Sequence, residues 1–447
     1  MSKIIYAVSA ILMSIFMLVS SASALPVFAR QTGMACSACH FQHFPMLNGF
    51  GRAFKSAGYT LVGAQPKLEG EGLSIPGTLN MAVLTTAGYE KTNQATQPTI
   101  PPSPTKSAGD GVVYVPGSGG ELALFFGGRV SDNAGFLAEL GNGHPPSTAT
   151  TTTIGISSAK LPLMFNMPFM TMEDTRAGIV PFTTNYQGAS YGFELLNTGA
   201  SAVHMMSVPG LNGAHAAALS AQQYINTAGH ATGIAAVASS SLGFINVTKF
   251  NQTGAGGVYA GLTSTYIRIA GIFSLAGWDA AAGIQNWSGK SATTSNTAGV
   301  AGQLSETEAT AVDAQMQGAW ANMPVGLYAS YATAPSPVSG NPSTFNTTVA
   351  TGNGTTARNS LNVSGELGLM PEKLTIGIAV RRGKSGVGSS NDNAIMLNST
   401  YKFAQNMLGS VSLTKATGSF WYSNGSKTGT TDIIGNTTLT INLFTLF

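Results

Sequence analysis

Short segments in which apolar and polar residues alternate recur through most of the chain, and they constrain its fold more than any other feature. Between Leu361 and Leu369 the residues Leu361, Val363, Leu367 and Leu369 alternate with polar or small residues. Successive side chains of a β-strand point to opposite faces, so the segment is predicted to be a strand with one apolar and one polar face. Similar alternation marks further segments: Glu121–Val130, Leu374–Arg381, and the two segments on either side of Ala404–Asn406.

The connections between these segments are of two kinds. Some are tight, as at Ser131–Asn133, Ala321–Pro324 and Met370–Lys373, whereas others are long and rich in Thr, Ser, Gly, Ala and Pro, as at 93–111, 288–305 and 334–358. Only 9% of residues are charged, against roughly 25% in a soluble domain, and no internal stretch resembles a membrane-spanning helix. Short turns and long loops are typical of a transmembrane outer-membrane β-barrel. A secreted β-sandwich is the alternative, although it rarely tolerates so many long loops.

The all-β fold predicted here is a barrel of about 16 antiparallel strands, the number for which the chain has room. Its last strand falls within Asn436–Phe447, and the terminal phenylalanine resembles the signal by which outer-membrane proteins are assembled. The polar face carries charges of both signs and is expected to line a hydrated lumen. These charged residues are Glu121, Arg129, Glu139, Arg268, Glu366, Arg381 and Lys402.

The N-terminus has the three parts of a secretory signal peptide. Lys3 supplies the positive charge, Ile4–Val19 is apolar apart from small hydroxyl residues, and Ala22-Ser23-Ala24 matches the cleavage pattern. The apolar run is short for a membrane anchor of roughly 20 residues. We therefore expect residues 1–24 to be removed and the mature chain to begin at Leu25.

Both cysteines of the chain lie in the pentapeptide Cys36-Ser37-Ala38-Cys39-His40. With two residues between them, the thiols can reach the two vinyl groups of one haem, and the histidine that follows can ligate the iron. Haem attachment of this type needs an exported chain, in agreement with the signal peptide. The sequence thus predicts one covalent haem c, held by Cys36 and Cys39, with His40 as the metal ligand.

Two other roles for these residues are open. A thioredoxin-like disulfide is one, but the motif lies only a dozen residues into the mature chain, outside any βαβ pattern. A zinc site formed by Cys36, Cys39, His40 and His43 is the other. Zinc sites usually draw their ligands from two separated segments, and these four residues fall within eight.

A helix is predicted after the motif. Pro45 suits its first position and Gly58 a left-handed C-terminal cap, and Leu47, Phe50 and Phe54 form one apolar stripe between them. Arg52 and Lys55 lie on a neighbouring face, where they are expected to bind the haem propionates unless they simply face solvent. The sixth iron ligand stays open among Met34, Met46 and Met81, because a thioether is one common choice.

The stretch Phe28–Pro45, with its continuation Leu47–Lys55 and Gly58-Tyr59, closely resembles the fused cytochrome–porins of iron-oxidising bacteria. The resemblance is specific only over about residues 28 to 60. It implies an outer-membrane Fe(II) oxidase in which one haem passes electrons from extracellular Fe(II) to a periplasmic cytochrome c or cupredoxin. It also implies haem binding by Cys36, Cys39 and His40.

The sequence divides into a signal peptide at 1–24, a monohaem segment at 25–68 and a porin-like barrel at 69–447. The monohaem segment is too short for a core of its own, so we expect it to lie inside the barrel as a plug. A porin with a structural or sensory haem, and electron transfer from a donor other than iron, are the competing hypotheses. Outer-membrane lipid is an expected partner. Nucleic acid is not, because the formal net charge is +3 and the basic residues are scattered.

Overall fold

A computed structural model describes residues 27–63, 65–77, 79–92, 111–141, 155–167, 174–198, 220–255, 261–292, 304–338, 342–346, 354–388, 390–419 and 437–447. The predicted signal peptide and most of the loop at 93–111 lie outside these residues. The helices are α2 (Val27–Thr32), α3 (Cys36–Cys39), α4 (Gly49–Ser56), the 3-10 helix η1 (Gly188–Gly192) and α6 (Ala221–Tyr224). Within the described ranges, no helix is long and apolar enough to span a membrane.

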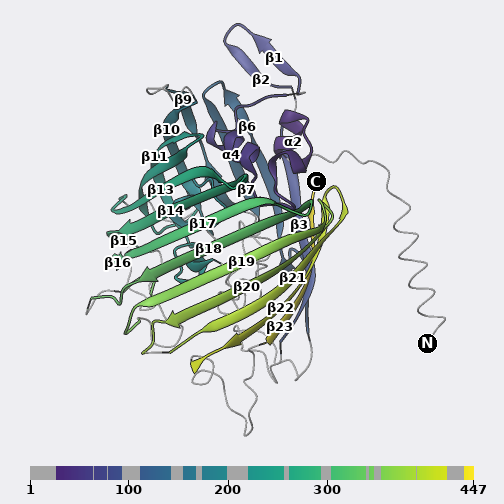
Figure 1. Cartoon of the computed structure of the whole chain (residues 1–447). Coiled ribbons are helices and arrows are strands. Elements are labelled where there is room, and N and C mark those ends of the chain that lie inside the picture. Colours follow the sequence, from purple (N-terminus) through teal and green to yellow (C-terminus); the bar gives the residue numbers. More distant parts are fainter. Residues whose placement is uncertain are drawn as a thin grey trace, which may run out of the picture.

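The strands follow in chain order (Figure 1). They are β1 (Lys67–Gly70), β2 (Leu73–Pro76), β3 (Met81–Thr92), β4 (Val112–Pro116), β5 (Gly119–Gly120), β6 (Leu122–Ser131), β7 (Ala134–Gly141), β8 (Gly155–Lys160), β9 (Leu163–Asn166), β10 (Arg176–Thr184), β11 (Ala231–Ser240), β12 (Gly243–Asn251), β13 (Ser264–Leu275), β14 (Trp278–Ser288), β15 (Lys290–Ala292), β16 (Leu304–Glu306), β17 (Ala309–Trp320), β18 (Met323–Ala334), β19 (Arg358–Met370), β20 (Leu374–Ser385), β21 (Asn393–Ala404), β22 (Met407–Thr417) and β23 (Thr437–Leu446).

The strands close into a barrel because β23 pairs antiparallel with both β22 and β3. Two positions in the wall are filled by broken strands. The segments β4 and β6 follow one another along β3, and β8 and β9 follow one another along β10. Counted this way, the described part of the chain forms a closed antiparallel barrel of 16 strands, which confirms the predicted fold.

The two faces of the wall differ as the alternation predicts. On β19 the side chains of Leu361 and Val363 are exposed on the outside, whereas Asn362, Ser364 and Glu366 are buried on the inside. Exposed aliphatic side chains occupy the same outer face on neighbouring strands: Ile376, Ile378, Val380, Ile395, Leu397, Val411, Leu413, Ile441 and Leu443. An apolar outer band and a polar interior are the pattern of an outer-membrane barrel.

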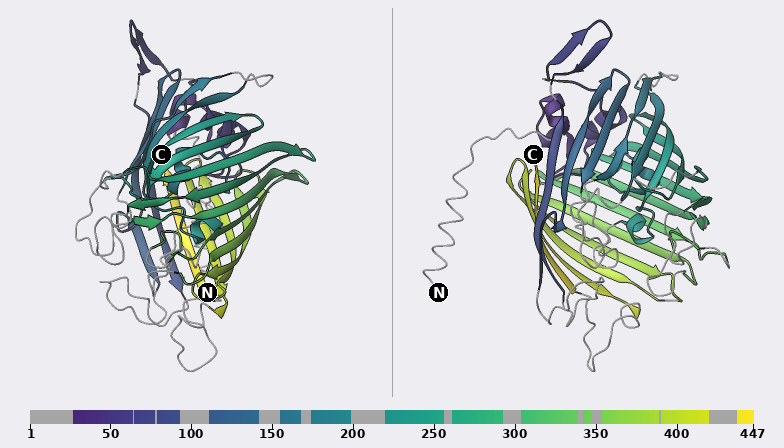
Figure 2. Two further views of the ribbon diagram at one scale, coloured as in Figure 1. Left: turned by 90° about the vertical axis from the view of Figure 1, so that its left-hand side faces the viewer. Right: turned by 180° about the vertical axis from the view of Figure 1, so that it is seen from behind.

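The tight turns predicted from the sequence gather at one end of the barrel. They join β6 to β7, β17 to β18, β19 to β20 and β21 to β22. The C-terminus and the N-terminal helices lie at this end, and the β1–β2 hairpin projects beyond it (Figures 1 and 2). The first barrel strand begins only at Met81. Along the chain, the hairpin therefore lies between the helical segment (27–63) and the strands that form the barrel wall.

The helical segment lies inside the barrel, as expected for a plug. It contacts strands on several sides of the lumen: Gln31 accepts a hydrogen bond from the backbone N–H of Arg129 on β6, Arg52 pairs with Asp279 on β14, and Gln42 contacts Thr375 on β20. Because these strands surround the lumen, the segment crosses it at the short-turn end.

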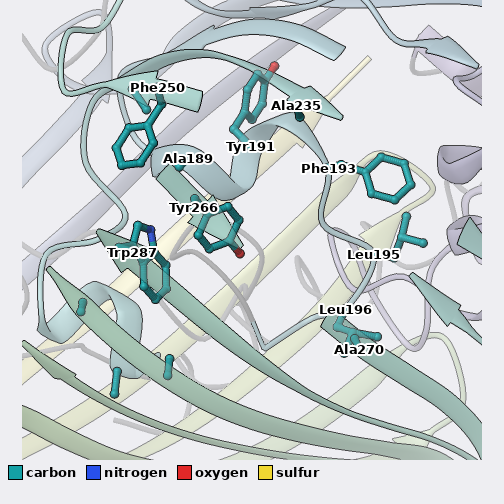
Figure 3. Packing of buried hydrophobic residues seen from close by; sticks show 14 of the residues in the cluster. Ala189, Tyr191, Phe193, Leu195, Leu196, Ala235, Phe250, Tyr266, Ala270 and Trp287 are labelled. Carbon is teal, nitrogen blue, oxygen red and sulfur yellow. The ribbon is translucent and has the colours of Figure 1, made fainter. Parts of the chain in front are cut away.

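A second segment folds inward between β10 and β11, the fifth and sixth strands of the wall. Its described parts are residues 185–198 and 220–230, including η1 and α6. Tyr191, Phe193, Leu195 and Leu196 bury their side chains with Phe250, Tyr266 and Trp287 of the wall (Figure 3). The sequence pattern alone did not predict this inward segment.

The two-faced wall leads to a direct test. Leu397 lies in the middle of β21 and is 52% exposed on the outer face. Leu397→Arg is expected to destabilise the barrel by about 2–4 kcal/mol, because it places a charge at the membrane midplane. Urea unfolding of protein refolded into lipid vesicles measures this change. Glu372→Arg, in the exposed β19–β20 turn, is the control and should leave stability unchanged. Equal effects of the two substitutions would contradict the assignment of Leu397 to the lipid-facing side of the barrel.

Candidate haem site in the barrel lumen

The pentapeptide motif forms one helical turn. In α3 the backbone N–H of His40 donates to the carbonyl of Cys36 (2.9 Å), so both cysteines and the histidine lie around a single turn. The two thiols are free and partly buried, and burial raises the pKa of each. Cys36 lies near Lys402 and Gln405, at the turn between β21 and β22. The motif is therefore inside the lumen and beside its wall.

His40 is held in the form that ligates a metal. Its Nδ1 lies 3.2 Å from the carbonyl oxygen of Met46, and because a carbonyl only accepts, Nδ1–H must donate. The neutral ring then carries its lone pair on Nε2. Burial lowers the pKa of His40 to about 4, so the ring is neutral at ordinary pH. A histidine ligand to iron commonly has its other nitrogen bonded in this way.

The donor set thus fits a c-type haem. Cys36 and Cys39 would form the thioether bonds and the Nε2 of His40 would bind the iron. The ring of Phe44 lies edge-on to His40, with 5.1 Å between centroids, and stacks on Phe444 of β23 at 5.4 Å. These rings provide an apolar wall beside His40.

The helix after the motif begins later than predicted. Asn48, and not a residue near Pro45, caps it, because the Asn48 side chain accepts a hydrogen bond from the backbone N–H of Gly51. The expected cap at Gly58 is confirmed: Gly58 has a φ of +70°, and Tyr59 N–H donates to the carbonyl of Phe54. The predicted apolar stripe is not buried along its whole length, because Phe54 is buried whereas Phe50 is exposed.

The two basic residues of this helix differ in environment. Arg52 is buried, and its Nη2 lies 2.5 Å from Oδ2 of Asp279, while Nη1 has no hydrogen-bond partner among the described residues. Lys55 is half-buried; burial lowers its pKa, and nearby Glu194 acts in the opposite direction. Arg52 is thus already engaged by the wall through one nitrogen. Propionate binding by Arg52 and Lys55 stays a prediction.

His43 anchors the segment and is not placed for a zinc site. Its Nδ1 lies 2.9 Å from the carbonyl of Phe44, and its Nε2 lies 3.0 Å from Oε2 of Glu366 on β19. Burial opposes a charge on His43, but the ion pair and hydrogen bond with Glu366 outweigh it and raise the pKa. Among the described residues, no three His, Cys, Asp or Glu side chains gather into a metal-binding group.

The inward segment also contacts the helical segment, which the sequence did not predict. The side chain of Asn197 accepts from the backbone N–H of Leu47 (2.8 Å) and donates to its carbonyl (2.9 Å). The adjacent Glu194 pairs with Arg268 on β13, and Arg268 pairs with Asp313 on β17. Wall, inward segment and helical segment are therefore joined by buried polar contacts.

The methionines leave the sixth ligand open. Met46 is fully buried and its carbonyl holds His40, whereas Met34 and Met81 are partly exposed. The contacts of the described residues do not decide among the three methionines.

No protein-family model and no curated protein matches this chain. Solved porin structures resemble it at low similarity. OmpT of Vibrio cholerae in its trimer form has 9% identity and a TM-score of 0.48, over 83% of this chain and 99% of that one. OmpF of Salmonella typhi, in complex with daunomycin, has 12% identity and a TM-score of 0.47, over 86% and 100%. An anion-selective porin of Comamonas acidovorans has 11% identity and a TM-score of 0.42, over 83% and 99%.

Close contact between α3 and α4 leads to a prediction about this site. A Cβ on Gly51 would lie 2.2 Å from the carbonyl oxygen of Cys39, whereas a Cβ on Gly49 would meet nothing nearer than 3.4 Å. Gly51→Ala should therefore push the two helices apart and raise amide hydrogen exchange across residues 36–56, measured by mass spectrometry. Gly49→Ala is the matched control and should leave exchange unchanged. Similar exchange in both variants would refute the close contact.

The ion pair between His43 and Glu366 gives a pH dependence. The pKa of His43 is higher in the folded protein than in the unfolded chain, where it is near 6.5. The ion pair therefore stabilises the folded segment fully below pH 6.5, and this stabilisation is lost as the pH rises through the pKa of the folded state. Protection of residues 41–47 against exchange, corrected for the intrinsic rate, should thus fall from acidic to alkaline pH. The fall should disappear in Glu366→Gln and persist in Glu372→Gln. A pH-dependent fall that survives in Glu366→Gln would show that another group is responsible.

Proposed function

We propose that this chain is an outer-membrane cytochrome–porin, in which the helical segment carries one haem and transfers electrons from extracellular Fe(II) to a periplasmic carrier. The observation that supports this most directly is the state of His40. A neutral imidazole, with Nδ1 bonded to a carbonyl and Nε2 left to bind a metal, follows two thiols on the same turn. A disulfide would not need this tautomer. A zinc site would use the same one, but His43 is engaged by Glu366, and among the described residues no three His, Cys, Asp or Glu side chains gather into a metal-binding group.

The position of the motif supports electron transfer across the barrel. The helical segment lies in the lumen at the end with the short turns, which in outer-membrane barrels faces the periplasm. A haem held there would supply a one-electron couple, so that one Fe(II) becomes Fe(III) and one electron passes to an oxidised cytochrome c or cupredoxin. Residues His43, Gln42 and Phe44 hold the segment to β19, β20 and β23.

Passage of small solutes is the second candidate function. A closed barrel of 16 strands with a polar lumen is the architecture of a porin. The inward segment between β10 and β11 narrows this lumen. The helical segment crosses the same lumen, which favours a closed pore. In this reading a haem would have a structural or sensory role.

Anaerobic mixing of the oxidised, detergent-solubilised protein with Fe(II) tests the proposal. Haem absorption should show reduction, and His40→Ala should abolish it while the barrel still assembles, because the iron loses its protein ligand. Heat-dependent migration in gels checks assembly, and reduction of the wild type by dithionite checks that a reducible haem is present. Dithionite reduction without Fe(II)-dependent reduction would overturn the iron oxidase, and conductance in planar bilayers would then favour the porin.

A further inference from the structure

Exposed charges are divided unequally between the two ends of the barrel. At the short-turn end the exposed side chains are mainly acidic, namely Glu69, Glu71, Asp132, Asp174 and Glu372. At the opposite end, which we call the long-loop end, the exposed basic side chains are Lys91, Lys249, Lys290, Arg382, Lys384 and Lys415. Glu308 is the only exposed carboxylate there among the described residues. The formal net charge of +3 does not reveal this separation.

Three of these cations form a cluster on the outside of the wall. Arg382 and Lys384 on β20 alternate with the buried residues Arg381 and Gly383, and Lys415 on β22 is exposed between buried neighbours. Their side chains therefore point away from the lumen. Only β21 separates β20 from β22 (Figure 1), so β20 and β22 are roughly 10 Å apart. Long Arg and Lys side chains can reach one ligand across that distance.

The cluster lies at the edge of the apolar outer band. Val380 is the outward-facing residue before Arg382, and Leu413 is the one before Lys415; both are exposed. Ile395 of β21 lies opposite Val380 on one side and opposite Lys415 on the other. A charge inside the hydrocarbon layer is costly. The cations are therefore at the level where the acyl chains end and the lipid headgroups begin.

No carboxylate of this part of the wall offsets the positive charges. The outward-facing described residues of β19–β23 and β3 include no Asp or Glu, and none of the three cations forms an ion pair with a described residue. Lys91 on β3, opposite Leu439 of β23, adds a further positive charge to the same side of the barrel. Like charges on one face repel each other. An anionic partner at this level would remove the repulsion.

We propose that Arg382, Lys384 and Lys415 bind the phosphate groups of a lipid in the outer leaflet of the membrane. Because the short turns of outer-membrane barrels face the periplasm, the long-loop end faces outward. The matching lipid has phosphates in its headgroup and acyl chains that cover the apolar band below. Arginine binds phosphate through two parallel N–H donors, and lysine binds it as a point charge. This binding depends on neither a haem nor iron oxidation.

Titration of the detergent-solubilised full-length protein with lipid A, an acylated disaccharide that carries two phosphates, tests the proposal. Native mass spectrometry counts the bound lipid. Each cation near an anionic lipid contributes about fivefold in affinity, so the double variant R382Q/K415Q should bind about 25-fold more weakly. The matched control K67Q/K373Q removes two exposed cations from the short-turn end and should bind as the wild type does. Heat-dependent migration in gels checks that each barrel is folded.

Lipid A without its phosphates separates the phosphate contact from the apolar contact. The wild type should bind it about as weakly as R382Q/K415Q binds the phosphorylated lipid. Equal binding of both lipids by the wild type would overturn the proposal, because the cations would then only border the apolar band. An equal loss in the two double variants would overturn it as well, since net charge and not this cluster would be responsible. Complete displacement of the lipid by millimolar inorganic phosphate would show a site for the free anion instead.

Discussion

Closure of the sheet is the constraint on which the rest of the structure depends. In lipid, every backbone N–H and C=O must find a partner within the protein, so a membrane-spanning sheet cannot leave an edge unpaired. The pairing of β23 with both β22 and β3 removes the last edge. Closure also divides the side chains into two sets, because each strand then has one face in lipid and one in the lumen. The low charge content of the sequence follows from this division.

The polar lumen then determines how other segments can be held inside. The inward segment packs Tyr191, Phe193, Leu195 and Leu196 against apolar side chains of the wall. It and the helical segment are also fixed by buried polar contacts, such as His43 with Glu366 and Asn197 with Leu47. Such contacts are specific in geometry, since an unsatisfied buried group is costly. They hold the pentapeptide at the short-turn end and keep His40 in one tautomer.

Much of the fold could be predicted because a barrel follows from local patterns. Alternation at Leu361–Leu369 and the turn at Met370–Lys373 depend on neighbouring residues only, and both are confirmed. The inward segment could not be predicted, because its partners Arg268 and Asp313 are distant in sequence. The helix start was misplaced since Pro45 and Asn48 are both plausible first-turn residues, and the side-chain cap at Asn48 decided between them. The pairing of Arg52 with Asp279 likewise depends on how distant segments meet.

The central claim is that a haem is joined to this chain through Cys36 and Cys39. The intact mass of the purified protein, measured after full denaturation, tests it most directly, because thioether bonds survive unfolding whereas non-covalent binding does not. The account predicts the mass of the chain from Leu25 to Phe447 plus one haem. A mass equal to that of the polypeptide alone, in protein recovered as a folded barrel, would contradict it.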